Sequence, residues 1–524
     1  MLPLQIAVHH CLRHSRLPAK LDTQPQAVIQ AGDDLTINPF DCHEAQRRPL
    51  LQSPFAHGDI RRLTFFRANA GGRLIRARHR RRRGNTRHST RHARRAWHRE
   101  QQPYRADQGD SALHDAKLYT WVRSLRPIVN PIVYAIPVFI LTIALEAWLA
   151  HRRRIATYDI ADAITSLHFG VLSQVSGVFV RALSFGAYVL VFEHMRWFTL
   201  PVDSVWVWLG ALIAYDFIYY WVHRFGHETH LMWAAHEVHH SSEYFNLSTA
   251  LRQTSTGAFA SFPFYLPLAL LGVPPVVFGT VALIDLLYQY WVHTELVRKL
   301  GWADRVFVTP SNHRVHHGQN DYCIDRNYGG ILIVWDRMFG TFVEERDAEP
   351  VVYGIRKPLA SYNPLWGNLH TYRDLGRRMM ASDSPWAALR AMVSSPTSRA
   401  SQPEHFDPRR FTRYAPPTTK ATRTYALIQY ALLIAPTTHF IAVAMRLTMG
   451  ERVAYALLIL VWTVGVGWVL EGRRHARSLE SLRVGATTSA LLLLPAWFGW
   501  HTSLEVKLAI AAIALGSLQL IHRR

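Results

Sequence analysis

Eight histidines fall into three groups whose spacing suits metal binding. Residues three or four positions apart share one face of a helix, so each group can direct its imidazoles to a common point. Eight imidazoles exceed what one first-row transition metal accepts, which makes two metals in one nitrogen-rich site the economical interpretation. The groups are His223 and His227; His236, His239 and His240; and His313, His316 and His317.

The metal inferred from these groups is iron. The three cysteines, Cys11, Cys42 and Cys323, are too few and too scattered to accompany the histidines, which argues against structural zinc. Imidazole sites with open positions suit iron that must bind dioxygen. The scarcity of cysteine also excludes a disulfide framework and fits a reducing compartment.

Two further residues next to the groups are candidates for the site. His293 ends an apolar stretch and emerges on the face expected to carry the groups, which makes it a candidate ninth ligand. Asp216 lies one to two turns before His223, where its carboxylate could orient a ligand imidazole. His230 and His370 stand alone, and we interpret both as surface or satisfied core residues.

The elements that must position these histidines are membrane helices. The chain is 49% hydrophobic, and its apolar runs, which begin after about residue 127, reach the roughly 20 residues that a helix needs to cross a bilayer. We expect an all-α, polytopic membrane bundle. Crossing segments are predicted near residues 128–150, 169–192 and 204–222, with a helical hairpin over 258–292 and further helices near 425–446, 452–471, 484–500 and 505–521.

Convergence of the histidines restricts the topology. Residues 223–257 and 294–424 must lie on the same membrane face, and the hairpin between them provides the required even number of crossings. Arginine and lysine flank these segments, and basic clusters follow the helices near 452–471 and 505–521, which two predicted crossings separate. By the positive-inside rule, the di-metal site is expected to face the cytoplasm.

The outer parts of the chain differ in character. Residues 351–424 are predicted to be a polar linker region, with Pro/Ser/Thr-rich stretches near 394–403 and 415–424, before a C-terminal membrane block at 425–524. The formal net charge of +22 comes largely from residues 61–105. We expect residues 1–115 to be disordered or an upstream translation artefact, rather than a basic arm for anionic lipid or nucleic acid, so no nucleic-acid partner is predicted.

Several motifs resemble the fatty acid hydroxylase and sterol desaturase superfamily. Asp216 to His227 reads D-F-I-Y-Y-W-V-H-R-F-G-H, and two H-x-x-H-H motifs follow. The run from Trp233 to Gln253, W-V-H-T-E at 291–295 and T-P-S-N-H-R-V-H-H-G at 309–318 are more similar to alkylglycerol monooxygenases than to sterol desaturases. The resemblance covers about residues 117–345, within a predicted catalytic domain of 116–350.

This resemblance implies a reaction and its cofactors. It implies a membrane-bound di-iron monooxygenase that uses dioxygen to hydroxylate the carbon next to the ether oxygen of an alkylglycerol, with tetrahydrobiopterin as electron donor. Within that scheme Glu228 is a candidate for proton handling, and Glu243, Tyr244 and Asn246 are candidates to contact the lipid head group. Helix-end solvation or capping is the alternative role for these four residues.

Two other functions stay open at this point. A fatty acid or sterol hydroxylase or desaturase would use the same histidines, because ligand spacing does not distinguish the reactions, and a redox protein could replace the pterin. A membrane metal transporter would also gather histidines, but it should place ionisable residues along a path inside its helices. Here the histidines cluster at helix ends, although Glu146 and Arg181 do lie inside predicted spans.

Overall fold

A segment inside a bilayer must satisfy its backbone hydrogen bonds internally, which makes the helix the natural form of long apolar runs. The computed structural model describes residues 131–396 and 406–522, and every regular element within these ranges is a helix. The predicted basic segment at 1–115 lies outside the described residues, as does the beginning of the predicted catalytic domain at 116–130.

Six helices of the described residues are long and apolar enough to cross a membrane, which makes the protein a multi-pass membrane protein and confirms the predicted all-α class. Basic residues end the first of these helices at His151, Arg152 and Arg153. The six are α6 (Pro131–Arg153), α7 (Ile160–Met195), α8 (Val205–Glu228), α19 (Lys420–Val443), α20 (Met449–Leu470) and α22 (Leu504–His522).

The remaining helices of the described residues are shorter or more polar. They are α9 (His230–Ala234), α10 (Glu237–His240), α11 (Leu247–Ala250), α12 (Gly257–Ser261), η1 (Phe262–Tyr265), α13 (Leu266–Leu270), α14 (Pro275–Trp291), η2 (Ala303–Arg305), α15 (Pro310–His316), α16 (Val334–Met338), α17 (Pro364–Met380), α18 (Pro385–Val393) and α21 (Ala476–Leu493).

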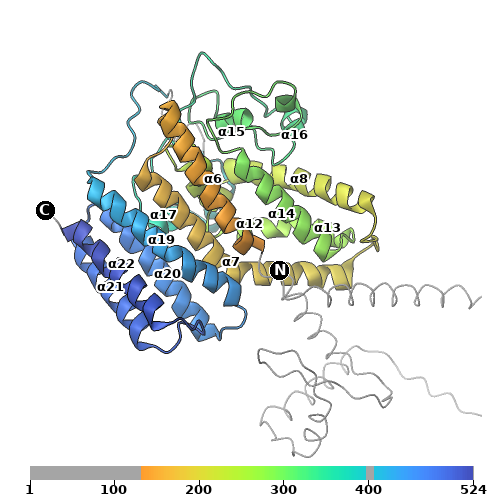
Figure 1. Ribbon diagram of the computed structural model, residues 1–524. Helices are drawn as coiled ribbons and strands as arrows, with labels where there is room; N and C mark the ends of the chain where they lie inside the picture. The colour runs from red at the N-terminus through yellow and green to blue at the C-terminus, as the bar shows by residue number, and fades with distance from the viewer. Residues whose placement is uncertain (1–130, 397–405, 523–524) are drawn as a thin grey trace, which may run out of the picture. The chain divides into compact units, whose positions relative to one another are not determined.

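Helix α7 joins the two halves of the bundle. It packs against α13 and α14 on one side and against α19 and α20 on the other, while α8 packs along α14 (Figure 1). The C-terminal helices form their own group, in which α22 packs against α19 and α21. A core of buried aliphatic and aromatic residues, including Ile164, Leu433, Phe440 and Ile459, fills the contact between α7 and this group.

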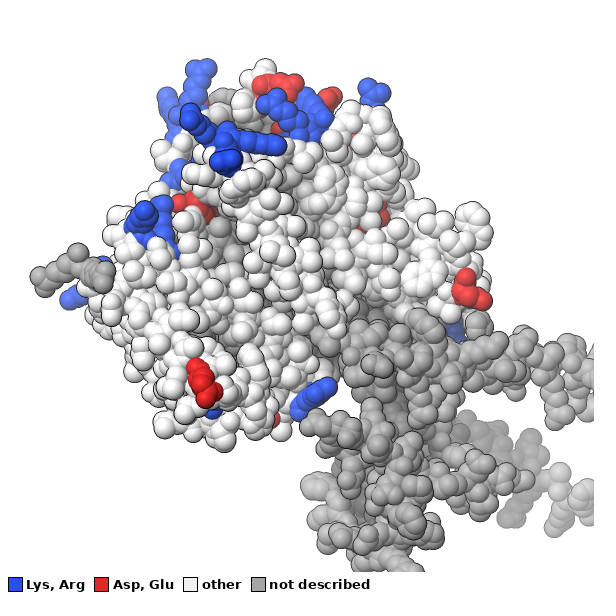
Figure 2. All heavy atoms as spheres, in the orientation of Figure 1, with Lys and Arg blue, Asp and Glu red and all other residues white. Residues whose placement is uncertain are grey.

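Charge is unevenly distributed over the surface. On the face drawn in Figure 2, lysine, arginine, aspartate and glutamate gather at the end where α15 and α16 lie, and a broad uncharged band follows. Large apolar side chains in the apolar helices are exposed, among them Leu141 and Trp148 on α6 and Leu457 on α20. An uncharged band with exposed apolar side chains is what a helix bundle presents to lipid tails.

The predicted hairpin over 258–292 is confirmed. Its first limb is made of α12, η1 and α13, its second limb is α14, and the turn between them contains Gly272 at a φ of +85°. That left-handed conformation favours glycine because it lacks a Cβ atom. The hairpin returns the chain to the histidine-rich face, as the topology argument requires.

Two predictions about the C-terminal half need correction. The helix expected near 484–500 is α21, which begins at Ala476 and ends at Leu493. Its first turns carry Glu480 and Arg483, which form a buried ion pair at 2.7 Å, and Tyr425 donates a hydrogen bond to Glu480. Because these charges satisfy each other inside the bundle, the helix extends into residues that hydropathy alone excluded.

The region predicted as a polar linker, 351–424, is more structured than expected. It contains the amphipathic helix α17 and the short helix α18, and the stretch predicted as linker at 415–424 already contains the start of α19 at Lys420. Of the other stretch, 394–403, residues 397–403 lie outside the described residues. Asn363 caps α17 by accepting hydrogen bonds from Leu365 N and Trp366 N, so this helix has a local origin in the sequence.

Candidate metal centre

The histidines are positioned by the ends of two long helices and by two short helices at the charged end of the bundle. His223 and His227 lie one turn apart at the end of α8, and His293 lies two residues after the end of α14. Helix α10 carries His239 and His240 after His236, and α15 carries His313 and His316 before His317. Pro310 stands in the first turn of α15, where its missing N–H costs no helical hydrogen bond.

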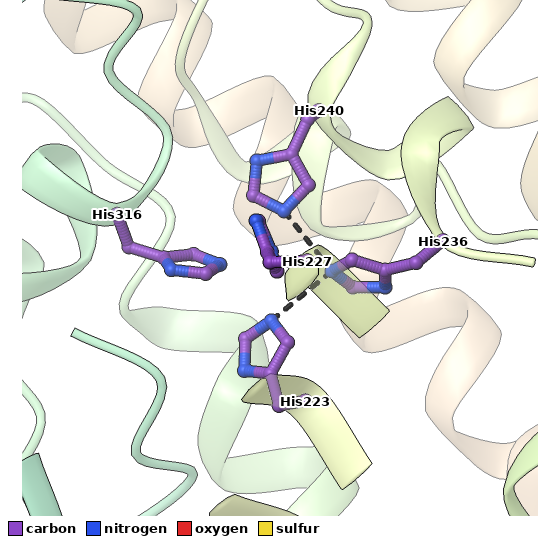
Figure 3. Close-up of side chains that lie close together, drawn as sticks. All are labelled: His223, His227, His236, His240 and His316. Carbon is purple, nitrogen blue, oxygen red and sulfur yellow. Dashed lines mark hydrogen bonds between the residues drawn. The ribbon is translucent and has the colours of Figure 1, made fainter. Parts of the chain in front are cut away.

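All nine predicted metal-binding histidines are brought together, in two adjoining groups. In each group one ring nitrogen per residue lies within 4.8 Å of every other. Figure 3 shows the first group, with its rings directed toward a common centre. The first group is His223, His227, His236, His240 and His316, and the second is His239, His293, His313 and His317.

The groups divide each H-x-x-H-H motif, a detail that differs from the sequence prediction. Each motif was expected to aim at one point, but its two members four residues apart enter one group and its middle member enters the other. In the first motif, His236 and His240 thus join the first group and His239 joins the second. In the last motif the assignment is reversed, and its middle residue His316 joins the first group. Each H-x-x-H-H motif therefore contributes histidines to both groups.

Backbone carbonyl groups hold several of the imidazoles in orientation. The Nδ1 atoms of four histidines lie within hydrogen-bond distance of backbone oxygens. A carbonyl oxygen can only accept, so these Nδ1 atoms carry the proton and the Nε2 atoms present lone pairs. The pairs are His223 with Tyr328 at 2.8 Å, His239 with Arg252 at 3.1 Å, His293 with Gln289 at 2.7 Å and His316 with Arg326 at 2.9 Å.

The resulting arrangement of lone pairs fits bound cations. The Nε2 atoms of His239 and His293 lie 3.3 Å apart, and the proton of each ring is already engaged at Nδ1. Two lone pairs facing each other in a buried site repel unless a cation lies between them. The Nε2 atoms of His227 and His316 are also buried without a hydrogen-bond partner among the described residues. The donor set therefore fits metal ions.

Burial keeps the site neutral and available for metal. It lowers the pKa of His239 to about 4, and the carbonyl of Arg252 opposes only part of that shift. A neutral imidazole is the form that binds a metal ion. Burial also lowers the pKa values of His236, His240, His293, His313, His316 and His317 well below the ordinary value, with neighbouring histidines adding to the effect.

Asp216 acts further from the imidazoles than the sequence suggested. It is 1% exposed, and its carboxylate accepts hydrogen bonds from Ile331 N at 2.6 Å, Leu332 N at 3.1 Å and Trp335 Nε1 at 2.8 Å. None of these donors is an imidazole. Since Tyr328, whose carbonyl contacts His223, precedes this segment, Asp216 can influence the site through the backbone.

Glu228 lies at the end of α8, where it pairs with Arg224. The Arg224 Nε atom donates to Glu228 Oε1 at 2.9 Å, and the glutamate side chain is 35% exposed. This ion pair joins residues four apart on one helix face. The contact accounts for the position of Glu228 without an imidazole partner.

The three residues predicted to contact a lipid head group make contacts that hold loops together. The Glu243 carboxylate accepts from Tyr414 N at 2.5 Å, and the Arg413 guanidinium lies over the Tyr244 ring at 4.4 Å. Asn246 caps α11 by accepting from Ser248 N at 3.0 Å and donates to the Thr157 carbonyl at 2.7 Å.

A cavity of about 370 Å³ adjoins the histidines. His223, His236, His239 and His293 form part of its wall. Helices α6, α7, α8, α14 and α19 provide most of the rest, largely with apolar side chains, and residues between 250 and 265 complete it. The residues that line it include none of Glu243, Tyr244 and Asn246, among the residues that the structure describes. Its largely apolar lining suits an aliphatic chain with one end at the histidines.

Sequence reasoning missed several polar residues of this cavity. Asp285 and Gln289 line it from α14, and the Gln289 side chain accepts from Tyr219 at 2.6 Å and donates to Asp285 at 2.5 Å. Asp285, Gln289 and His293 are spaced four residues apart, which places them on one helix face. That spacing within an apolar stretch was the available signal. Helix α19 contributes Tyr430 without any motif.

Comparisons with known proteins agree with this site. Residues 208–341 match the family model described as fatty acid hydroxylase. The chain is 35% identical to alkylglycerol monooxygenase of Homo sapiens over 70% of this chain and 83% of that protein, and 37% identical to that of Danio rerio over 72% and 84%. It is 33% identical to the ornithine lipid hydroxylase OlsE of Rhizobium tropici over 26% of this chain and 40% of that protein. No solved structure matches the chain.

The relationship extends well beyond the histidine motifs, since it covers more than four fifths of the human protein. Together with the six apolar helices and the paired histidine groups, it makes the protein a membrane-bound lipid monooxygenase. The chain belongs to the alkylglycerol monooxygenase family.

Proposed function

We propose that the protein holds two iron ions and uses dioxygen to cleave the ether bond of alkylglycerols. The observation that carries this proposal is the contact between two neutral histidine groups and an apolar cavity. The names of the human and zebrafish relatives support the substrate class, and the donor set of nine imidazoles without a thiolate supports iron.

The proposed reaction balances with an external reductant. One oxygen atom of dioxygen enters the C–H bond next to the ether oxygen, while two electrons and two protons reduce the other oxygen atom to water. The product is a hemiacetal, which collapses to a fatty aldehyde and glycerol. We propose tetrahydrobiopterin as the electron donor because of the family relationship, with a redox protein as the alternative.

The bound metals would supply the activation of dioxygen. The chain's own residues position the reactants. Carbonyl contacts at Nδ1 keep the rings of His223, His239, His293 and His316 directed into the site, which prepares the donor set before substrate arrives. The apolar wall of the cavity excludes water from the reacting carbon and aligns the alkyl chain with the histidines.

The predicted roles of the nearby polar residues are part of the proposal. Glu228 would exchange protons with solvent at the end of α8, for which its partial exposure is suitable. Asp216 would act as a positioning residue. Glu243, Tyr244 and Asn246 would act on head-group binding through the loops that they hold together, since each is engaged in loop contacts.

We also propose that the histidine groups face the cytoplasm. Arg152 and Arg153 end α6, and Arg473, Arg474 and Arg477 lie between α20 and the body of α21. These clusters are separated by an even number of predicted crossings. Positive residues of short loops favour the cytoplasmic side.

Aldehyde release from 1-O-hexadecylglycerol tests the function. Purified, iron-loaded protein would be assayed with dioxygen and either tetrahydrobiopterin, a ferredoxin or a cytochrome as donor. We expect pterin-dependent aldehyde, about two irons per chain by mass spectrometry, and loss of both in His223→Ala and His239→Ala. His475→Ala, at an exposed position between α20 and α21, is the matched control.

The two variants remove one histidine from each group, so both groups are tested separately. Protein that holds two irons but releases no aldehyde with any donor would exclude alkylglycerol cleavage. Full iron content and activity in both variants would exclude the histidine groups as the metal site. Hydroxylated or desaturated fatty acid or sterol products would establish the alternative reaction.

A further inference from the structure

Arg181 is a cation inside an apolar helix, and it lines the same cavity as the histidines. It lies on α7, within one of the six apolar helices, and its side chain is half-buried. A charged group in a membrane segment is costly and in most proteins serves a pathway or a ligand. Glu146, another charged residue inside a predicted span, has three partners, Tyr158, Leu247 and Thr294, and is explained by packing.

The protein satisfies little of the hydrogen-bonding capacity of Arg181. Its NH1 atom donates to Gln174 Oε1 at 2.9 Å. Among residues 131–396 and 406–522, no carboxylate forms an ion pair with it. A guanidinium has five N–H donors and no acceptor. Most of this donor capacity is therefore available to an anionic group in the cavity.

Gly177 leaves the space that the Arg181 guanidinium occupies. A Cβ atom at Gly177 would lie 2.8 Å from Arg181 Nε and 2.9 Å from its Cζ atom. The missing side chain allows the arginine to run back along α7 to Gln174, two turns toward the N-terminal end of the helix. Gly170, one turn further, packs against Leu251, the residue before Arg252, whose carbonyl contacts His239. The cation is thus directed toward the histidine end of the cavity.

We propose that Arg181 and Gln174 form a subsite for the phosphate of a phosphorylated alkylglycerol. This inference rests on the proposed function and specifies its head group. The guanidinium lies at the level of the residues four to seven positions after Gly170. That separation corresponds to a rise of about 6–10 Å along α7. From the carbon next to the ether oxygen, the phosphorus of a 3-phosphate is six bonds away, at most about 9 Å. Guanidinium groups match phosphate oxygens in geometry and charge.

The test compares two lipids that differ in the phosphate alone. These are 1-O-hexadecylglycerol and 1-O-hexadecylglycerol 3-phosphate, with hexadecanoate as a second anion. Affinities would be measured on the iron-loaded protein under argon, where no turnover occurs, and kcat/KM for aldehyde release would be measured in air. The variants are Arg181→Gln and Gly177→Ala, with Arg196→Gln as control, because Arg196 directly follows α7 and does not line the cavity.

We expect Arg181→Gln to lower the affinity for the phosphate lipid, relative to the neutral lipid, by roughly tenfold or more. Gly177→Ala should change the same ratio because it displaces the guanidinium without removing its charge, and Arg196→Gln should leave the ratio as in the wild type. An unchanged ratio in Arg181→Gln would overturn the proposal, as would a selective loss of hexadecanoate. Binding under argon does not require catalysis, so failed ether cleavage with intact phosphate selectivity would reject the proposed function alone.

Discussion

The Nδ1 atom of His239 lies 3.1 Å from the carbonyl oxygen of Arg252, and the side chain of that arginine anchors the same motif to α7. The guanidinium of Arg252 donates to Asp162 at 3.2 Å and to Ser166 at 3.0 Å, and its Nε atom donates to Val238 O at 3.1 Å. Arg252 is 2% exposed. One buried arginine thus orients a candidate metal ligand with its backbone and holds α10 with its side chain.

Asp162→Asn should destabilise the protein and its second histidine group. The substitution leaves the buried Arg252 guanidinium without its carboxylate, and breaking a buried ion pair from one side costs about 3–5 kcal/mol. We expect a lower melting temperature in detergent and an iron content below two per chain. Asp203→Asn, at an exposed position before α8, is the control. A wild-type melting temperature in Asp162→Asn would show that the ion pair contributes little.

Asp216→Asn should weaken the first histidine group by loosening the backbone that follows Tyr328. An amide can offer an N–H where the carboxylate accepts, which leaves a buried backbone donor unsatisfied at a cost of about 1–3 kcal/mol. We expect reduced iron content and an altered Mössbauer spectrum of the remaining iron. Trp335→Phe removes a single donor to Asp216 and should give a smaller effect in the same direction. Unchanged iron content and an unchanged Mössbauer spectrum in both variants would exclude Asp216 from a role at the site.

The contact between His370 and Glu237 predicts a pH-dependent stability. His370 Nε2 lies 3.2 Å from Glu237 Oε1, and this carboxylate raises the pKa of His370 above its ordinary 6.5, against the effect of burial. Because the folded-state pKa is the higher one, the stabilisation is complete below pH 6.5 and is lost as the pH rises through the raised value. The difference in melting temperature between wild type and His370→Gln should therefore shrink between pH 6 and pH 9. Parallel curves over that range would contradict the prediction.

Much of the site was predictable because helical spacing is local. Residues three and four apart share a face, so eight of the histidines were found from the chain alone, and His293 from the hairpin topology. The exchange of His239 and His316 between the groups was not predictable, because it depends on how α8, α10 and α15 meet. The periodicity within one helix does not describe how separate helices pack.

The fold was predictable to a similar extent. Long apolar runs gave the spans, since length and hydropathy decide membrane insertion. The start of α21 and the role of Arg252 depend on ionic contacts, and hydropathy counts charged groups as unfavourable. The contact of Arg252 also joins residues that are 90 positions apart in the sequence. The cavity forms where α7, α14 and α19 pack together. The sequence therefore showed Arg181 inside an apolar stretch but did not show which residues surround it.

Ala282→Phe should shorten the alkyl chain that the enzyme accepts. Ala282 lines the cavity from α14, so a phenyl ring there occupies space that the end of a long chain would use. We expect kcat/KM for an octadecyl ether to fall on the order of tenfold relative to a dodecyl ether, since a few lost methylene contacts have effects of that size. Leu287→Phe is the matched control, because Leu287 lies on the same helix, is 41% exposed and does not line the cavity. A uniform loss for both chain lengths in Ala282→Phe would instead indicate a disturbed His293, which follows the same helix, and iron content would then fall as well.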